Sequence, residues 1–180
     1  MKTGKSKIIT TSQKLTIATF GGRYDEGTYR SVDLTVESPT FNVTSVASFL
    51  KSPSLPAPMN SVTQPSLASF KSSTSSAQVD ILLTYGWPAS ITKFSKTVPS
   101  FLDGDSSVPP LDEIVVACRP RYHFAAAGAS PPPFWEREPF VWRGGQIDGA
   151  ITRFISLGAF GGSSDAPGGK RPRVSNYTDL

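Results

Sequence analysis

The stretch that most constrains the fold of this chain is the strand-like run 79–84, with the sequence VDILLT. Apart from Asp80 and the terminal Thr84, it is apolar at positions that would point to both faces of a sheet. Strands with one solvated face alternate apolar and polar residues, whereas the central strands of parallel sheets are apolar on both faces. The run therefore predicts a central strand in an α/β sheet that helices cover. Asp80 itself is expected to bond to backbone rather than to act as a catalytic acid.

A helix and a second strand are predicted downstream of this run. Apolar residues fall at i, i+3, i+4 and i+7, which is one face of a helix: Leu111, Ile114, Val115 and Cys118. Pro109 and Pro110 suit the entry of that helix, and Pro120 ends it because proline lacks an amide hydrogen. We expect a helix over 111–119, then a strand over 121–126 that runs into an Ala/Gly loop.

The rest of the chain carries weaker patterns. Strands are predicted over 7–11, 15–20, 134–142 and 150–160, and a short helix near 44–51. Residues 23–39 read as irregular. The segment 52–77 is rich in serine and proline and has few large apolar residues, so it is predicted to be a disordered insertion. We expect one domain over 6–160, followed by a disordered basic tail over 161–180.

Composition limits the chemistry. The 180 residues include one histidine and one cysteine, His123 and Cys118. A structural zinc site needs about four Cys or His ligands, and a two-metal phosphoesterase site needs several His together with Asp. We therefore expect no metal, no cofactor and no internal disulfide. No apolar run approaches the roughly 18 residues that span a bilayer, so no membrane partner is expected. A net charge of +4 allows a nucleic-acid partner without requiring one.

Basic and aromatic side chains supply the candidate contacts with RNA or a protein partner. They are Arg119, Arg121, His123, Trp135, Arg137 and Arg153. Arginine and aromatic groups grip phosphates and stack on bases, and both recur at protein interfaces. A structural role remains open for each of them, including a salt-bridged sheet surface around 135–138. A basic cluster in the tail is a candidate nuclear import signal: Lys170, Arg171, Pro172 and Arg173.

Several segments, in this order along the chain, resemble one known family. Residues 79–88 (VDILLTYGWP), 119–125 (RPRYHFA), 134–140 (FWEREPF) and 152–155 (TRFI) resemble motifs of the CwfJ family of spliceosome-associated proteins. Residues 8–24 are similar to its upstream strand pair, which ends in Gly-Gly. The resemblance covers roughly 6–51 and 78–160.

The resemblance implies a fold and a role. The amino-terminal domain of this family is similar to the metallophosphoesterase domain of the lariat debranching enzyme. The chain would then be a partial metallophosphoesterase-like α/β sandwich that lacks its first half. By this resemblance, Tyr85, Ala127 and Ala129 stand where that enzyme has histidine ligands.

A non-catalytic relative follows from this, a pseudoenzyme of the nucleus. It would act in pre-mRNA splicing and lariat turnover with the lariat debranching enzyme, late spliceosome components and intron RNA. The alternative is a metal-dependent phosphodiesterase that completes its site with another chain.

Overall fold

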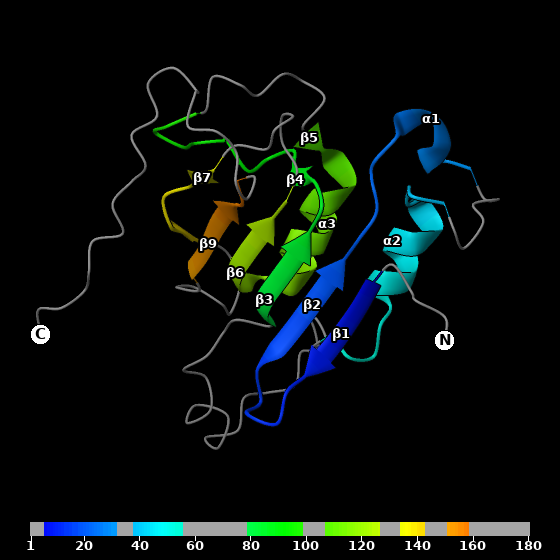
Figure 1. The fold of residues 1–180 in the computed structure, drawn as a ribbon, viewed down its shortest axis with the longest axis horizontal. Coiled ribbons are helices and arrows are strands. Elements are labelled where there is room, and N and C mark those ends of the chain that lie inside the picture. The colour runs from blue at the N-terminus through cyan, green and yellow to red at the C-terminus, as the bar shows by residue number, and fades with distance from the viewer. Residues whose placement is uncertain are drawn as a thin grey trace, which may run out of the picture.

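A single mixed sheet organises the structure, a computed structural model that describes residues 6–31, 38–55, 79–98, 107–126, 134–142 and 151–158. Its strands are β1 (Ser6–Thr10), β2 (Thr16–Phe20), β3 (Val79–Thr84), β6 (Pro120–Ala125), β7 (Trp135–Glu136), β8 (Phe140–Val141) and β9 (Ile151–Ser156). They run in the order β1-β2-β3-β6-β9-β7, and β8 also pairs with β9 (Figure 1). The four central strands are parallel, whereas β1, β7 and β8 pair antiparallel with their neighbours.

Within the described residues, three helices accompany the sheet: α1 (Glu26–Tyr29), α2 (Val43–Leu50) and α3 (Pro109–Cys118). Asn42 starts α2 by accepting a hydrogen bond from the Ser45 amide at 3.0 Å, and the Ser45 side chain completes a capping box. α3 starts on its two prolines and ends at Cys118, and the next residue, Arg119, has a left-handed φ of 41°. A residue that precedes proline is disfavoured in the right-handed helical region. Because Arg119 precedes Pro120, the helix ends one residue before the predicted end at 119.

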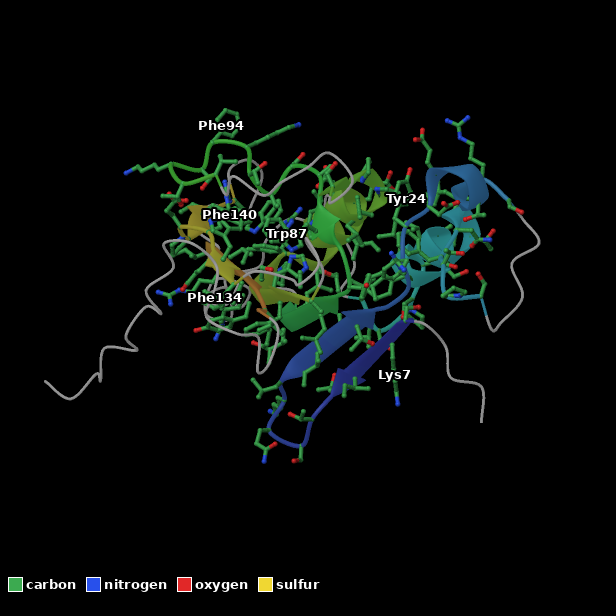
Figure 2. The ribbon with its side chains drawn as sticks, turned by 45° about the horizontal axis from the view of Figure 1, so that its top comes forward. Lys7, Tyr24, Trp87, Phe94, Phe134 and Phe140 are labelled. Atoms are coloured by element: carbon green, nitrogen blue, oxygen red, sulfur yellow. The ribbon has the colours of Figure 1, made fainter. Side chains whose placement is uncertain are left out.

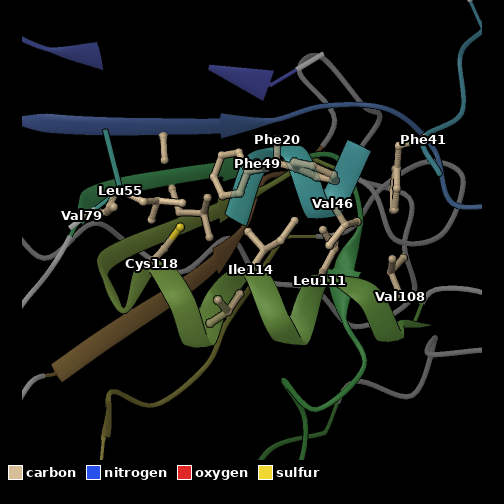
Figure 3. Close-up of a cluster of buried hydrophobic side chains, with 13 residues drawn as sticks. Phe20, Phe41, Val46, Phe49, Leu55, Val79, Val108, Leu111, Ile114 and Cys118 are labelled. Carbon is tan, nitrogen blue, oxygen red and sulfur yellow. The ribbon is translucent and has the colours of Figure 1, made fainter. Parts of the chain in front are cut away.

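Both long helices pack on the same face of the sheet. The chain crosses from β2 through α2 to β3, and then from β3 through α3 to β6, so both crossovers advance in one direction. Right-handed parallel connections that advance in one direction place their helices on the same face. The core lies between that face and the helices (Figure 3). There the ring of Phe20 packs edge-on against Phe41 and Phe49, with centroids 5.0 and 5.4 Å away.

The opposite face of the sheet carries no helix among the described residues, and we call it the open face. Toward the carboxyl ends of the four parallel strands, the positions facing α2 and α3 are buried, whereas the positions between them are at least partly exposed. Leu82 and His123 on the helix side are fully buried. Leu83 and Tyr122 on the open face are 39% and 37% exposed.

A small second sheet lies beside α3. It pairs β4 (Trp87–Pro88) with β5 (Ser107–Val108), and neither strand was expected from the sequence. Gly86 precedes β4 and lies so close to Val108 of β5 that a Cβ on Gly86 would be 2.8 Å from Cγ2 of Val108.

The expected α/β class is confirmed, with its central strand at 79–84. Asp80 bonds to backbone as predicted, because its carboxylate accepts the Thr16 amide at 2.8 Å. The single strand expected over 134–142 is wrong, since the chain turns inward at Arg137 and divides it into β7 and β8.

Two boundaries also differ from the expected ones. The segment expected to be irregular, 23–39, contains α1. Leu55 is buried in the core, so the predicted insertion over 52–77 starts too early. The rest of that insertion, from residue 56, and the predicted tail lie outside the described residues.

Candidate functional site at the carboxyl edge of the sheet

The carboxyl ends of the parallel strands form the usual ligand-binding edge of an open α/β sheet. Thr84, Ala125 and Ser156 end β3, β6 and β9 at the same level across the sheet. The backbone continues this pairing beyond the strands: the Ala126 amide donates to Thr84 and the Leu157 amide to Ala125. The backbone hydrogen bonds are therefore continuous along this edge of the sheet.

The Thr84 hydroxyl and the His123 imidazole are hydrogen-bonded to each other next to this edge. Thr84 Oγ1 lies 2.8 Å from His123 Nε2 and also donates to the Gly86 carbonyl at 2.8 Å. Because the single hydroxyl proton goes to Gly86, the imidazole must be the donor in the other bond. His123 therefore carries its proton on Nε2, and Nδ1 is buried without a partner among the described residues.

A hydroxyl beside a histidine is also the pattern of an activated nucleophile, which needs an accessible oxygen and a base that can take its proton. Neither condition is met here. Thr84 and His123 are both buried, and burial lowers the pKa of His123 to about 3. A base with that pKa is far too weak for proton abstraction near neutral pH. The pair holds the end of β3 against β6.

Aromatic rings fill the space beside this pair. Trp87 and Trp135 stack with centroids 5.2 Å apart, and both contact Phe154, which in turn packs edge-on against His123. Figure 2 shows Trp87 in the interior of this region, in contrast to Phe94, which projects at its rim. The rings close the carboxyl edge around His123.

Arg137 and Glu138 hydrogen-bond to the turn 93–96, which adjoins this aromatic cluster. The Arg137 guanidinium donates to the Lys93 carbonyl at 2.8 Å and lies 4.2 Å above the Phe140 ring. Glu138 accepts hydrogen bonds from the Ser95 hydroxyl at 2.7 Å and the Lys96 amide at 3.0 Å. The Ser95 bond is the largest cause of the lowered pKa of Glu138. Burial lowers the pKa of the Arg137 guanidinium. Sequence reasoning missed these hydrogen bonds, because the partners lie more than 40 residues apart along the chain.

Two of the predicted contact residues do not reach the surface. His123 is fully buried, and Arg137 is buried with its guanidinium turned toward the 93–96 turn. Neither side chain is available to RNA or to a partner in this fold, which corrects those two predictions. Phe154 packs against His123, and the Phe140 ring and the Lys93 carbonyl hold the Arg137 guanidinium.

The other predicted contact residues are at least partly accessible. Arg121 and Arg153 are exposed, Trp135 is half-buried in the stack, and Arg119 caps α3. Arg153 is paired with Tyr122 on the open face, so Arg121, the neighbour of Tyr122, points to the other face. The two exposed arginines therefore do not form one surface.

The remaining predicted positions concern metal ligation and import. Tyr85 is exposed at the end of β3, and no group of three or more His, Cys, Asp or Glu in the described part of the chain is arranged to hold a metal ion. Ala127, Ala129 and the import cluster Lys170, Arg171, Pro172 and Arg173 lie outside the described residues. Within the described ranges, no helix is long and apolar enough to cross a membrane.

Comparison with known proteins finds two similar sequences. Over 84 residues the chain is 38% identical to the CWF19-like protein 1 homolog of Caenorhabditis elegans, covering 46% of this chain and 15% of that protein. Over 118 residues it is 31% identical to CWF19-like protein 1 of Xenopus laevis, covering 62% of this chain and 21% of that protein. No protein-family model matches the chain. The match thus spans about a fifth or less of each relative, and it supports a relationship to CWF19-like proteins over part of this chain.

Proposed function

We propose that this chain is a non-catalytic interaction module that acts in pre-mRNA splicing and intron-lariat turnover, beside the lariat debranching enzyme and late spliceosome components. The observation that carries the proposal is the similarity to two CWF19-like protein 1 sequences, over 84 and 118 residues. The resemblance of 79–88 and 119–125 to the CwfJ family of spliceosome-associated proteins points the same way. The fold would then be part of a metallophosphoesterase-like sandwich.

The ligand chemistry supports a role without catalysis. Metal-dependent phosphodiesterases hold their ions with several histidines and carboxylates. This sequence has one histidine, and its Nε2 is committed to Thr84 in a buried position. By the resemblance, Tyr85 and two alanines replace the ligands of the debranching enzyme, and a phenol is a poor metal ligand whereas an alanine has no donor atom.

Recovery of RNA from nuclear extract tests the splicing role. Tagged protein is captured, and excised intron lariats are measured by reverse transcription across the branch point. We expect lariat RNA and late spliceosome components to be enriched over an untagged control. Recovery at the control level for both would overturn the proposal.

A matched pair of charge reversals tests the expected contact of Arg121 with RNA or a partner. Arg121→Glu should reduce lariat recovery, because an exposed arginine next to phosphate contributes attraction that a carboxylate reverses. Lys51→Glu, exposed at the end of α2, makes the same change in net charge and should leave recovery unchanged. Equal losses in the two variants would exclude a specific contact at Arg121.

A metal assay separates this role from the phosphodiesterase alternative. The purified chain is incubated with Mn²⁺, and its bound metal and its hydrolysis of bis-p-nitrophenyl phosphate are measured. We expect neither stoichiometric metal nor turnover above the rate of buffer with Mn²⁺. Stoichiometric metal with turnover would replace the non-catalytic proposal by the alternative.

Nuclear localisation rests on the basic cluster Lys170, Arg171, Pro172 and Arg173. Fused to a reporter too large for passive entry, the chain should accumulate in the nucleus. Replacement of Lys170, Arg171 and Arg173 by alanine should move the fusion to the cytoplasm. Unchanged accumulation would show that the cluster does not direct import.

A further inference from the structure

We infer that the open face of the sheet is a self-association surface, on which a second copy of this chain packs face to face. This inference goes beyond the proposed splicing role and does not depend on it. It starts from the sheet itself: the four central strands are parallel, and parallel sheets occur almost only with both faces covered. In the described residues α2 and α3 cover one face only.

The open face is largely apolar between its two edges. One row of paired positions crosses five strands: Ile9, Ile17, Ile81, Tyr122 and Arg153. The adjacent row crosses six strands: Lys7, Thr19, Leu83, Phe124, Ile155 and Glu136. Ile9, Leu83 and Tyr122 are 40%, 39% and 37% exposed, and Ile151 extends the apolar area at the start of β9. Large apolar side chains gathered on one surface mark an interaction site rather than ordinary surface.

The charges on the six-strand row identify the occupant. The row has a cation at one edge, Lys7 on β1, and an anion at the other, Glu136 on β7, both exposed. Figure 2 shows Lys7 projecting from β1 away from the rest of the molecule. When two copies of this row face each other in opposite directions, the cation of each copy lies opposite the anion of the other, and the apolar middles meet.

A two-fold axis generates that opposite direction. A half-turn about an axis that runs along the strands, between β3 and β6 and midway between two facing sheets, exchanges β1 with β7, β2 with β9 and β3 with β6. Lys7 of one copy then faces Glu136 of the second copy, and the reciprocal pair forms at the other edge. Leu83 faces Phe124 of the second copy, and in the neighbouring row Ile81 faces Tyr122. Such an isologous arrangement is the commonest form of protein dimer.

The geometry is also that of known sheet packing. Two sheets that pack face to face keep their strands within about 30° of each other, which this axis satisfies. Arg153 would lie over Ile17 of the second copy, near the edge of the interface, where its long side chain can reach water. Single-stranded RNA is the other candidate for a face with an aromatic pair, but most of the apolar side chains on this face are aliphatic and offer no ring for base stacking.

The size of the face sets the expected affinity. Six strands about 4.8 Å apart and roughly five residues of about 3.3 Å each make a footprint on the order of 400 Å² per copy. Specific complexes bury about 800 Å² of accessible surface per partner. The accessible area of side chains exceeds the flat footprint, so the dimer lies at the small end of this range. We therefore expect a weak dimer that dissociates on dilution.

Sedimentation equilibrium over a wide range of protein concentrations tests the inference, with charge reversals as the specific probe. Lys7→Glu and Glu136→Lys should each weaken dimerisation roughly tenfold, because each change turns two attractive pairs into two repulsive ones. The double variant, which carries both reversals, restores opposite charges in both pairs and should dimerise within about threefold of wild type. Lys51→Glu, exposed at the end of α2 on the helix side of the sheet, is the control and should change nothing.

Leu83→Asp tests the apolar centre. It places a carboxylate at a position that is already 39% exposed, so the fold tolerates it, and it should weaken dimerisation at least about a hundredfold. A wild-type chain that is monomeric at every concentration would overturn the inference, as would a dimer that ignores Leu83→Asp. A dimer that the double reversal fails to restore would overturn the two-fold arrangement. A monomer that binds single-stranded RNA until Leu83 is replaced would assign the open face to RNA instead.

Discussion

The stability of this protein should fall steeply in mildly acidic solution, and His123 should be the cause. Burial lowers the pKa of His123 to about 3, whereas in the unfolded chain it lies near 6.5. Between these values the unfolded state binds one more proton than the folded state, so the free energy of unfolding decreases as the pH falls. The hydrogen bonds agree with this direction, because a proton added to Nδ1 would be buried without an acceptor among the described residues.

The size of the effect follows from that window. Each pH unit below 6.5 costs about 1.4 kcal/mol for one proton, so the loss between pH 7 and pH 5 is about 2 kcal/mol. That is a large fraction of the 5–15 kcal/mol by which domains are usually stable. The interval is well isolated, because the sequence has no other histidine. The pKa values of Asp25 and Glu138 are lowered, so these carboxyls take up protons only in more acidic solution.

Urea unfolding of wild type and of His123→Gln at pH 7 and pH 5 measures this loss. The glutamine amide can still donate to Thr84, but it does not titrate. We expect the variant to be less stable at pH 7 and nearly independent of pH across the interval. A wild type that is equally stable at both pH values, or a variant with the same decline as wild type, would refute the assignment to His123.

Three further outcomes follow from the packing. Burial raises the pKa of Cys118 to about 12, so its thiol should not react with a disulfide reagent until the protein is unfolded, and rapid reaction of the native protein would contradict the buried position. Gly86→Ala should destabilise by roughly 1–3 kcal/mol, because the new methyl group meets Val108, and adding Val108→Ala should recover part of that loss in urea melts. Phe20→Ala should cost about 3–5 kcal/mol, because it removes the ring on which Phe41 and Phe49 pack, and a loss below about 1 kcal/mol in thermal unfolding would place Phe20 outside the core.

The candidate site illustrates how far the sequence reaches. With a single histidine, the sequence already argued against a metal-dependent site, because such a site needs several ligands wherever they lie in the fold. Arg121 and His123 are two residues apart, so in a strand they lie on one face. The sequence could not show that His123 is buried with Phe154 packed against it whereas Arg121 stays exposed, because that depends on which side chains from distant segments cover each position.

What the sequence by itself determined is local. The apolar run 79–84 set β3, and the period of Leu111, Ile114 and Cys118 with the flanking prolines set α3 to within two residues. These signals act over one or two turns of chain, where backbone sterics and side-chain periodicity suffice. Only the tertiary structure decided the strand order and the burial of Arg137 against the Lys93 carbonyl, 44 residues away. It also decided that both helices cover the same face, because the direction of each crossover is a property of the assembled sheet and not of any segment.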